Sequence, residues 1–135
     1  MAQPRTRLAA AVLDAPDPRA LAAFYEQLLG WTVAVSEPAR PGHPPEDGWV
    51  ILRPPNGGSS LSFQFEPAYV RPVWPTADDQ PRMMMHLDIA VDDLEQAVAW
   101  ATHLGATVAD HQPQPDVLVM LDPAGHPFCL FPGTV

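Results

Sequence analysis

The segment Leu29-Gly30-Trp31-Thr32-Val33-Ala34 recurs further along the chain as Leu104-Gly105-Ala106-Thr107-Val108-Ala109, with a single difference between the two copies. Asp17 and Asp92 stand at the same distance before the glycine of their copy. Similarity at a fixed offset indicates that one structural unit occurs twice. The 135-residue chain is therefore expected to form a single domain, residues 1–135, from two modules at about residues 7–66 and 83–133. A linker at about 67–82 would join them.

Each copy carries the start and stop signals of one helix. Asp17 is a good N-cap residue, and the proline after it suits the first helical position, where a missing N–H costs nothing. Apolar residues then recur at three- and four-residue spacing until Gly30, which supplies the left-handed residue that ends a helix. In the second copy either Asp92 or Asp93 caps the helix, and Gly105 ends it.

Apolar or alternating segments, separated by proline, glycine and asparagine, indicate strands around each helix. In the first module they lie at residues 8–13, 32–36, 48–52 and 60–65. In the second module they lie at residues 83–91, 107–109, 117–121 and 128–131. The order β-α-β-β-β thus occurs twice. This order predicts an α+β fold in which each helix covers one face of a sheet.

Composition limits the classes of partner. The net charge of −9 argues against binding of nucleic acid, which needs a basic surface. The acidic charge keeps the protein soluble, and it favours a cationic small molecule over an anionic one. No apolar run approaches the roughly 20 residues of a membrane span. Cys129 is the single cysteine, so no internal disulfide can form, which is typical of the reducing cytoplasm. We therefore expect a cytoplasmic protein without nucleic-acid or membrane partners.

The residues that carry these signals resemble the vicinal-oxygen-chelate superfamily, and within it the glyoxalase-like and bleomycin-resistance-like proteins. The resemblance rests on Asp17-Pro18 with Phe24-Tyr25, on residues 85–92 (Met-His-Leu-Asp-Ile-Ala-Val-Asp), and on residues 122–125 followed by Phe128-Cys129-Leu130. It implies two βαβββ modules whose sheets curl into a cup with the helices outside. It also implies that a ligand lies in the cup and that chains of this size pair into homodimers.

The resemblance further implies where metal-dependent members bind their ion, namely at four strand positions that carry His, Glu or Gln. In this sequence those positions fall at Ala10 or Ala11, at Gln64 with Ser62 as the alternative, at His86, and at Cys129. Alanine cannot coordinate a metal, and an amide, an imidazole and a thiol do not make the octahedral site of a hard divalent ion. The sequence therefore predicts no functional metal and no cofactor.

Strand alternation predicts which side chains face the pocket, because neighbouring residues of a strand point to opposite faces. The large apolar residues of the fourth, fifth and last strands are assigned to the core under the helices, which turns the intervening residues to the other face. The side chains predicted to share one concave surface are Ser62, Gln64, His86, Asp88 and Cys129. Trp49, Met120 and Trp74 are expected to line the pocket as well.

Two functions from different classes fit this arrangement. The first is binding of a small organic molecule, aromatic or cationic, in a metal-free cup for sequestration or resistance. The second is a metal-free isomerase or lyase in which His86 is the candidate catalytic residue, acting with Asp88 or Cys129; the sequence leaves open whether there is any catalysis. The irregular segments at residues 37–47 and 66–82 are expected to cover the pocket. The alternative for the second segment is that its aromatic residues pack against its own domain.

Overall fold

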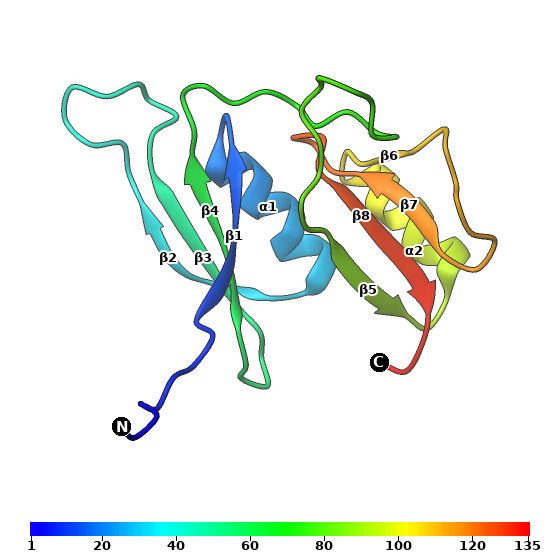
Figure 1. Cartoon of the computed structure of the whole chain (residues 1–135), viewed down its shortest axis with the longest axis horizontal. Helices are drawn as coiled ribbons and strands as arrows, with labels where there is room; N and C mark the ends of the chain where they lie inside the picture. The colour runs from blue at the N-terminus through cyan, green and yellow to red at the C-terminus, as the bar shows by residue number, and fades with distance from the viewer. The chain divides into compact units, whose positions relative to one another are not determined.

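The computed structural model describes all 135 residues, which form two compact units, Met1–Pro67 (unit 1) and Ala68–Val135 (unit 2). Unit 1 contains β1 (Ala10–Ala15), α1 (Pro18–Leu29), β2 (Thr32–Glu37), β3 (Trp49–Arg53) and β4 (Ser60–Phe65). Unit 2 contains β5 (Leu87–Val91), α2 (Leu94–His103), β6 (Thr107–Val108), β7 (Leu118–Leu121) and β8 (Pro127–Pro132) (Figure 1). The α+β class and the doubled β-α-β-β-β order are confirmed. Neither helix is long and apolar enough to cross a membrane.

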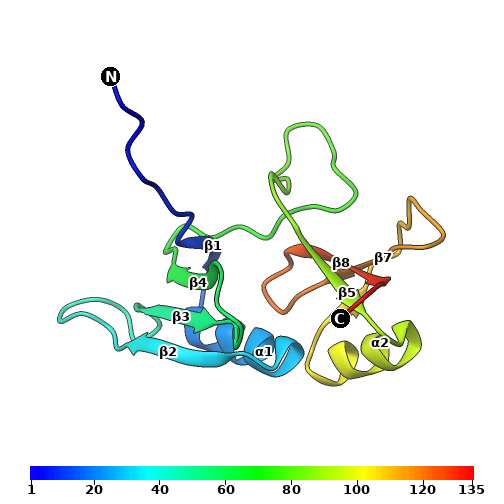
Figure 2. The same ribbon diagram turned by 90° about the horizontal axis from the view of Figure 1, so that it is seen from below.

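Both units have the same sheet topology. The strand order is β1-β4-β3-β2 in unit 1 and β5-β8-β7-β6 in unit 2. In each unit the first strand runs parallel to the last, and the other neighbours are antiparallel. Val12 lies beside Ser62 in the first sheet, and Asp88 lies beside Cys129 in the second. Each helix lies along one face of its own sheet (Figure 2), so the opposite face of each sheet is where a ligand site can form.

The helix ends follow the predicted signals. The Asp17 carboxylate accepts hydrogen bonds from the backbone N–H groups of Arg19 and Ala20, both at 3.1 Å, and Gly30 ends α1 at φ +66°. In the second copy the cap is Asp93, which accepts from the backbone N–H of Gln96 at 2.9 Å. Asp92 therefore matches Asp17 in the sequence repeat but not in the structure. The helix of unit 2 is correspondingly shorter, with 10 residues against 12.

Aromatic and aliphatic side chains fill the space between each helix and its sheet. In unit 1 the fully buried Tyr25 of α1 stacks on Phe63 of β4, with ring centroids 5.7 Å apart. In unit 2 Phe128 and Leu130 of β8 are fully buried, and α2 packs against this strand. Burying each such side chain contributes about 1.5–3 kcal/mol. These contacts fix which residues of β4 and β8 face the helices and which face away.

Two strands begin at least two residues later than the sequence predicts. β1 starts at Ala10 instead of residue 8, and β5 starts at Leu87 instead of residue 83. Leu87 lies opposite Phe128, close to the beginning of β8, so the residues before it have no strand partner. Met84 and Met85 are accordingly exposed. His86 therefore lies just before β5 and not within it.

Candidate functional site

A cavity of about 150 Å³ lies within unit 2, on the sheet face turned away from α2. Its wall is mostly apolar, with a histidine, a thiol and an amide as the polar groups. The lining residues are Trp74, Met83, His86, Pro113, Gln114, Val117, Val119, Pro127 and Cys129. Three residues predicted from the sequence to line a pocket, Trp74, His86 and Cys129, thus line the same cavity.

His86, Asp88 and Cys129 form a cluster at this cavity. The Nε2 atom of His86 lies 3.1 Å from Oδ1 of Asp88, and the donor atoms of all three side chains lie within 4.8 Å of one another. The cluster follows from the sheet register, because Asp88 is directly opposite Cys129 on neighbouring strands. The carboxylate orients the imidazole, and the pair can relay a proton or hold a polar group of a ligand.

Burial and the neighbouring carboxylate both act on the thiol of this cluster. Burial raises the pKa of Cys129 above its ordinary value, and the negative charge of Asp88 and the hydrogen bond to it raise the pKa further. A thiol with a raised pKa is protonated at neutral pH and is a poor nucleophile. Cys129 is thus suited to donate a hydrogen bond, and the arrangement does not favour covalent catalysis by this residue.

The segment after Pro67 is fixed to unit 2. The Tyr69 hydroxyl donates to the backbone oxygen of Ala124 at 2.6 Å, and the Arg71 guanidinium donates to that of Pro123 at 2.9 Å. The Trp74 indole N–H donates to the backbone oxygen of residue 111 at 3.1 Å. The predicted linker therefore packs its aromatic residues against unit 2, and through Trp74 it also builds part of the cavity wall.

Met120 is placed differently from the expectation. Its side chain is completely buried, and it lies opposite Phe128, so it faces the core. Val119 lies opposite Cys129 and lines the cavity in its place. The physical reason is strand parity: once Cys129 faces the cavity, its cross-strand partner Val119 must do so, and the next residue must face α2.

The predicted pocket residues of unit 1 lie on the sheet face turned away from α1. Gln64 donates from its amide to the Asp14 carboxylate at 2.6 Å. Trp49 and Ser62 line a second cavity, of about 470 Å³, together with Arg7 and Arg53. The two arginines were not predicted as site residues. The alternation of β3 was the available signal for Arg53, because this residue points to the same face as Trp49.

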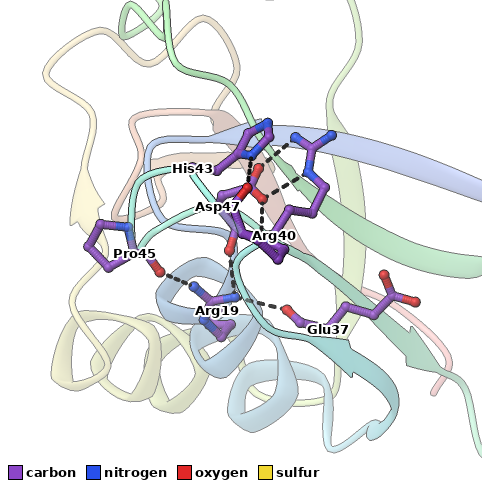
Figure 3. Close-up of polar contacts among 7 residues, drawn as sticks. Arg19, Glu37, Arg40, His43, Pro45 and Asp47 are labelled. Atoms are coloured by element: carbon purple, nitrogen blue, oxygen red, sulfur yellow. Dashed lines mark hydrogen bonds and ion pairs between the residues drawn. The ribbon is translucent and has the colours of Figure 1, made fainter.

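The segment between β2 and β3, expected to cover a pocket, is tied to its own unit (Figure 3). The guanidinium of Arg19, on α1, donates to three backbone oxygens, those of Glu37 at 2.9 Å, Pro45 at 2.7 Å and Asp47 at 3.0 Å. The buried Asp47 carboxylate accepts from the Arg40 backbone and from two guanidinium nitrogens at 2.8–2.9 Å. The hydrogen bonds from Arg40 lower the pKa of Asp47 well below its usual range. These bonds indicate a structural loop and not a mobile lid.

Comparison with known proteins now gives the family. The sequence profile of the "Glyoxalase-like domain" matches residues 10–131. The chain belongs to this glyoxalase-like family. The resemblance to the vicinal-oxygen-chelate proteins is thereby confirmed. Among curated proteins, none matches the sequence.

Solved structures with the glyoxalase-like fold agree with this assignment. A glyoxalase/bleomycin resistance protein/dioxygenase family enzyme from Burkholderia phytofirmans has a TM-score of 0.66 at 20% identity, covering 93% of this chain and 97% of that chain. The fosfomycin resistance protein FosX from Listeria monocytogenes, solved with Mn(II), has a TM-score of 0.69 at 13% identity, with coverages of 97% and 95%. An antibiotic-binding protein from a Streptomyces species has a TM-score of 0.61 at 17% identity, with coverages of 98% and 100%. At these identities the similarity shows the fold alone.

The metal site of the glyoxalase-like fold does not fit the residues of this chain. Ala10 lines the unit 1 cavity and offers no donor atom, and its neighbour Ala11 lies opposite Leu61, toward the core. At the second position Gln64 brings a neutral amide, which donates to Asp14, and the alternative Ser62 brings only a hydroxyl. In unit 2 the available donors are an imidazole, a carboxylate and a thiol, which is a softer set than Mn²⁺ or Ni²⁺ prefers. No step of a reaction is therefore assigned to a resident metal.

Proposed function

We propose that this glyoxalase-like protein binds a small organic molecule in the cavity of unit 2, without a resident metal, and thereby sequesters it or confers resistance to it. The proposal rests on the cavity itself, an apolar chamber with a few polar groups, which is the usual form of a small-molecule site. Its volume of about 150 Å³ suits a single ring, since a cavity of roughly this size in another protein binds benzene. We further propose that the protein acts in the cytoplasm, where its one thiol stays reduced.

The chemistry of the wall supports an aromatic ligand that is neutral or cationic. Trp74 supplies a flat aromatic surface, and Met83 supplies a polarizable thioether that packs well against rings. No lysine or arginine lines this cavity, so nothing there neutralises an anion. The nearby Asp88 carboxylate, which does not itself line the cavity, instead favours a cationic ligand through its charge. An antibiotic-binding protein of the same fold is a precedent for binding of this kind.

Benzylamine, a small aromatic cation, and benzoate, an aromatic anion of similar shape, test the proposal that the cavity of unit 2 takes a neutral or cationic ligand and not an anion. We expect benzylamine to shift the NMR signals of Trp74 and Val119 and to raise the melting temperature, because a ligand of the native state stabilises that state by mass action. Trp74→Ala should abolish these effects, whereas Trp100→Ala, which removes an exposed tryptophan of α2, should leave them intact. Binding of benzylamine that survives Trp74→Ala would place the ligand elsewhere and defeat the proposal.

The contact between His86 and Asp88 supports a second candidate, a metal-free enzyme that moves a proton. A histidine oriented by a carboxylate is a common general base, and the protonated thiol of Cys129 is a nearby donor. In heavy water, such an enzyme would exchange the C–H protons of its substrate that lie next to a carbonyl group for deuterium, and NMR detects this exchange. His86→Ala should then abolish exchange while most ligand affinity remains; a sequestering protein shows no exchange before or after the change.

We also propose that the chain forms a homodimer. Each sheet has two edge strands, β1 and β2 in unit 1 and β5 and β6 in unit 2. Unpaired edges expose N–H and C=O groups that favour association, and pairing with a second copy protects them. Light scattering at micromolar concentration should give twice the mass of one chain. The mass of a single chain would contradict the proposal.

A further inference from the structure

We propose that Asn56 is a site of spontaneous covalent modification, at which the chain converts its own asparagine into aspartate and isoaspartate through a cyclic imide. Asn56 is the only asparagine of the chain, and Gly57 follows it directly. Both residues lie in the turn at residues 54–59 that joins β3 to β4, and both are exposed there. The reactants are the chain itself and water, so the inference does not depend on the proposed function.

The reaction needs no cofactor and no enzyme. The backbone nitrogen of Gly57 attacks Cγ of Asn56, a bond between these two atoms forms, and the bond from Cγ to Nδ2 breaks. Nδ2 leaves as ammonia together with the proton of the Gly57 amide. Water then opens the imide at either of its two carbonyl groups. Opening at Cγ gives aspartate, and opening at the backbone carbonyl gives isoaspartate, in which the chain continues through Cγ.

The turn leaves both reacting groups accessible. No hydrogen bond or ion pair holds the side chain of Asn56, so its amide can rotate toward the next residue. Gly57 has φ +77°, and a Cβ atom built there would have no other atom within 4 Å. Glycine also brings no side chain of its own and adopts many backbone conformations. The attacking nitrogen therefore meets no steric obstacle.

The same type of dipeptide occurs once more in the chain, in opposite surroundings. Asp47 is the only aspartate that a glycine follows. Its carboxylate is buried and accepts three hydrogen bonds from Arg40. These bonds lower the pKa of Asp47, so the group stays ionised, and a carboxylate is a poor target for a nucleophile. A Cβ atom at Gly48 would overlap the Arg19 guanidinium, so this amide is also enclosed. We therefore expect modification at residue 56 and not at residue 47.

Modification at Asn56 changes the surface charge and leaves the strands in place. Each event replaces a neutral amide by a carboxylate and adds one negative charge to the net charge of −9. Gly57 lines the cavity of unit 1, whose charged lining residues, Arg7 and Arg53, are both basic. The new carboxylate thus arises beside two arginines and reduces the positive charge there. Isoaspartate lengthens the backbone by one methylene group, but the turn lies outside β3 and β4, so their pairing is retained.

The first experiment follows the unaltered, folded protein during incubation at mildly alkaline pH, which favours loss of the proton from the attacking nitrogen. We expect a more acidic form to accumulate on ion exchange. Peptide mapping should place the change at residue 56, and a carboxyl methyltransferase specific for isoaspartate should methylate the same peptide. Absence of isoaspartate at residue 56, after an incubation that converts a synthetic peptide of residues 52–61, would overturn the proposal.

The second experiment tests the two reacting groups separately. Asn56→Gln moves the amide one methylene group further along the side chain, so the ring closes less readily and the acidic form should not appear in the same time. Gly57→Ala places a methyl group beside the attacking nitrogen and should slow the reaction. Gly58→Ala is the matched control, because Gly58 also has positive φ and no atom within 4 Å of the added Cβ; its rate should be unchanged. An acidic form that still accumulates in Asn56→Gln would arise elsewhere and refute the site.

The third experiment tests whether the surroundings select the site. In urea both dipeptides are free, so isoaspartate should form at residues 47 and 56, whereas the folded chain should form it at residue 56 alone. Isoaspartate at residue 47 of the folded chain, at the rate seen in urea, would show that burial and Arg40 give no protection. That result would remove the structural basis of the proposal.

Discussion

The Nε2 atom of His86 and the Oδ1 atom of Asp88 lie 3.1 Å apart, on the sheet face that also carries Cys129. One carboxylate thus acts on two neighbours. It orients the imidazole by a polar contact, and it raises the pKa of the thiol in addition to the larger effect of burial. Asp88 therefore controls the chemistry of the cluster although it does not itself line the cavity.

Asp88→Asn should make Cys129 more reactive. The change removes a negative charge that opposes thiolate formation, so the pKa of the thiol falls and the thiolate fraction at pH 8 rises. Alkylation by iodoacetamide, followed by mass spectrometry, measures this directly because Cys129 is the only cysteine. Asp92→Asn, a change at an exposed carboxylate outside the cluster, is the control. A slower reaction in Asp88→Asn than in the control would contradict the assigned role of the carboxylate.

Asp47 should couple stability to acidic pH. Its pKa is lower in the folded chain than in the unfolded chain because Arg40 hydrogen-bonds to the carboxylate. A lowered folded pKa contributes stability that is complete above the unfolded value of about 4 and is lost as the pH falls below it. Urea unfolding should show that Asp47→Asn destabilises the protein most at pH 7 and less at pH 3, because the contribution of the carboxylate declines from the unfolded pKa down to the lower folded pKa. Asp78→Asn, at an exposed turn, should show no such difference; an equal loss for Asp47→Asn at both pH values would exclude the coupling.

Gly48→Ala should break the loop held by Arg19. Gly48 has φ +149°, and a Cβ atom there would overlap the Arg19 guanidinium and lie 2.6 Å from the backbone oxygen of Glu37. We expect a loss of at least about 2 kcal/mol in the free energy of unfolding, from backbone strain and overpacking together. Gly42→Ala is the matched control, because Gly42 also has positive φ but has no atom within 4 Å of the added Cβ. It should cost only the strain, about 1 kcal/mol; equal losses would show that the overlap does not matter.

The sequence predicted most of the fold because its signals are local. Caps, glycine stops and strand alternation depend on neighbouring residues, and the assignment of Phe63 and Phe128 to the core needed only the parity of one strand. Met120 shows where this reasoning fails. It was treated as able to reach the pocket, but its parity is set by the cross-strand register, in which Val119 lies opposite Cys129. Register depends on how two strands pair with each other and is not visible in one strand.

The candidate site could be predicted only in part for a similar reason. The cluster of His86, Asp88 and Cys129 in unit 2 could be predicted from a family motif and from strand alternation. Arg7 could not, because it lies outside any regular element, and Arg53 stands at the end of its strand. The hydrogen bonds of Arg19 join α1 to a loop that is far away in sequence, so composition could not reveal that this loop is held. That Ser62 and Gln64 share one concave surface with His86, Asp88 and Cys129 stays a prediction.

The purified protein should contain no stoichiometric Ni, Zn, Fe or Mn. Ala10 brings no ligand atom to the first metal position of the fold, and the donors of unit 2 number three, fewer than the four that hold structural zinc. Any zinc bound by His86, Asp88 and Cys129 should be weak and should be lost on dialysis. Elemental analysis after dialysis measures this, with Cys129→Ser as a comparison. One retained ion per chain that disappears in Cys129→Ser would contradict the prediction and identify the cluster as a metal site.

Met120→Ala and Val119→Ala should differ in the property that each changes most, the first mainly stability and the second ligand binding. Met120 is fully buried beside Phe128, so truncation leaves a void in the core and should lower the free energy of unfolding by about 2–5 kcal/mol. Val119 lines the cavity. Its truncation removes about two buried methylene equivalents and should lower the free energy of unfolding by about 1.5 kcal/mol.

Urea unfolding and benzylamine titration of both variants separate the two roles. Below the unfolding transition, Met120→Ala should bind benzylamine as the unaltered chain does, because its side chain does not reach the cavity. Val119→Ala should change the affinity, because it enlarges the chamber against which the ring packs. If Met120→Ala altered binding and Val119→Ala did not, the register of β7 on β8 would be shifted by one residue, and the assignment of Cys129 to the cavity would fall with it.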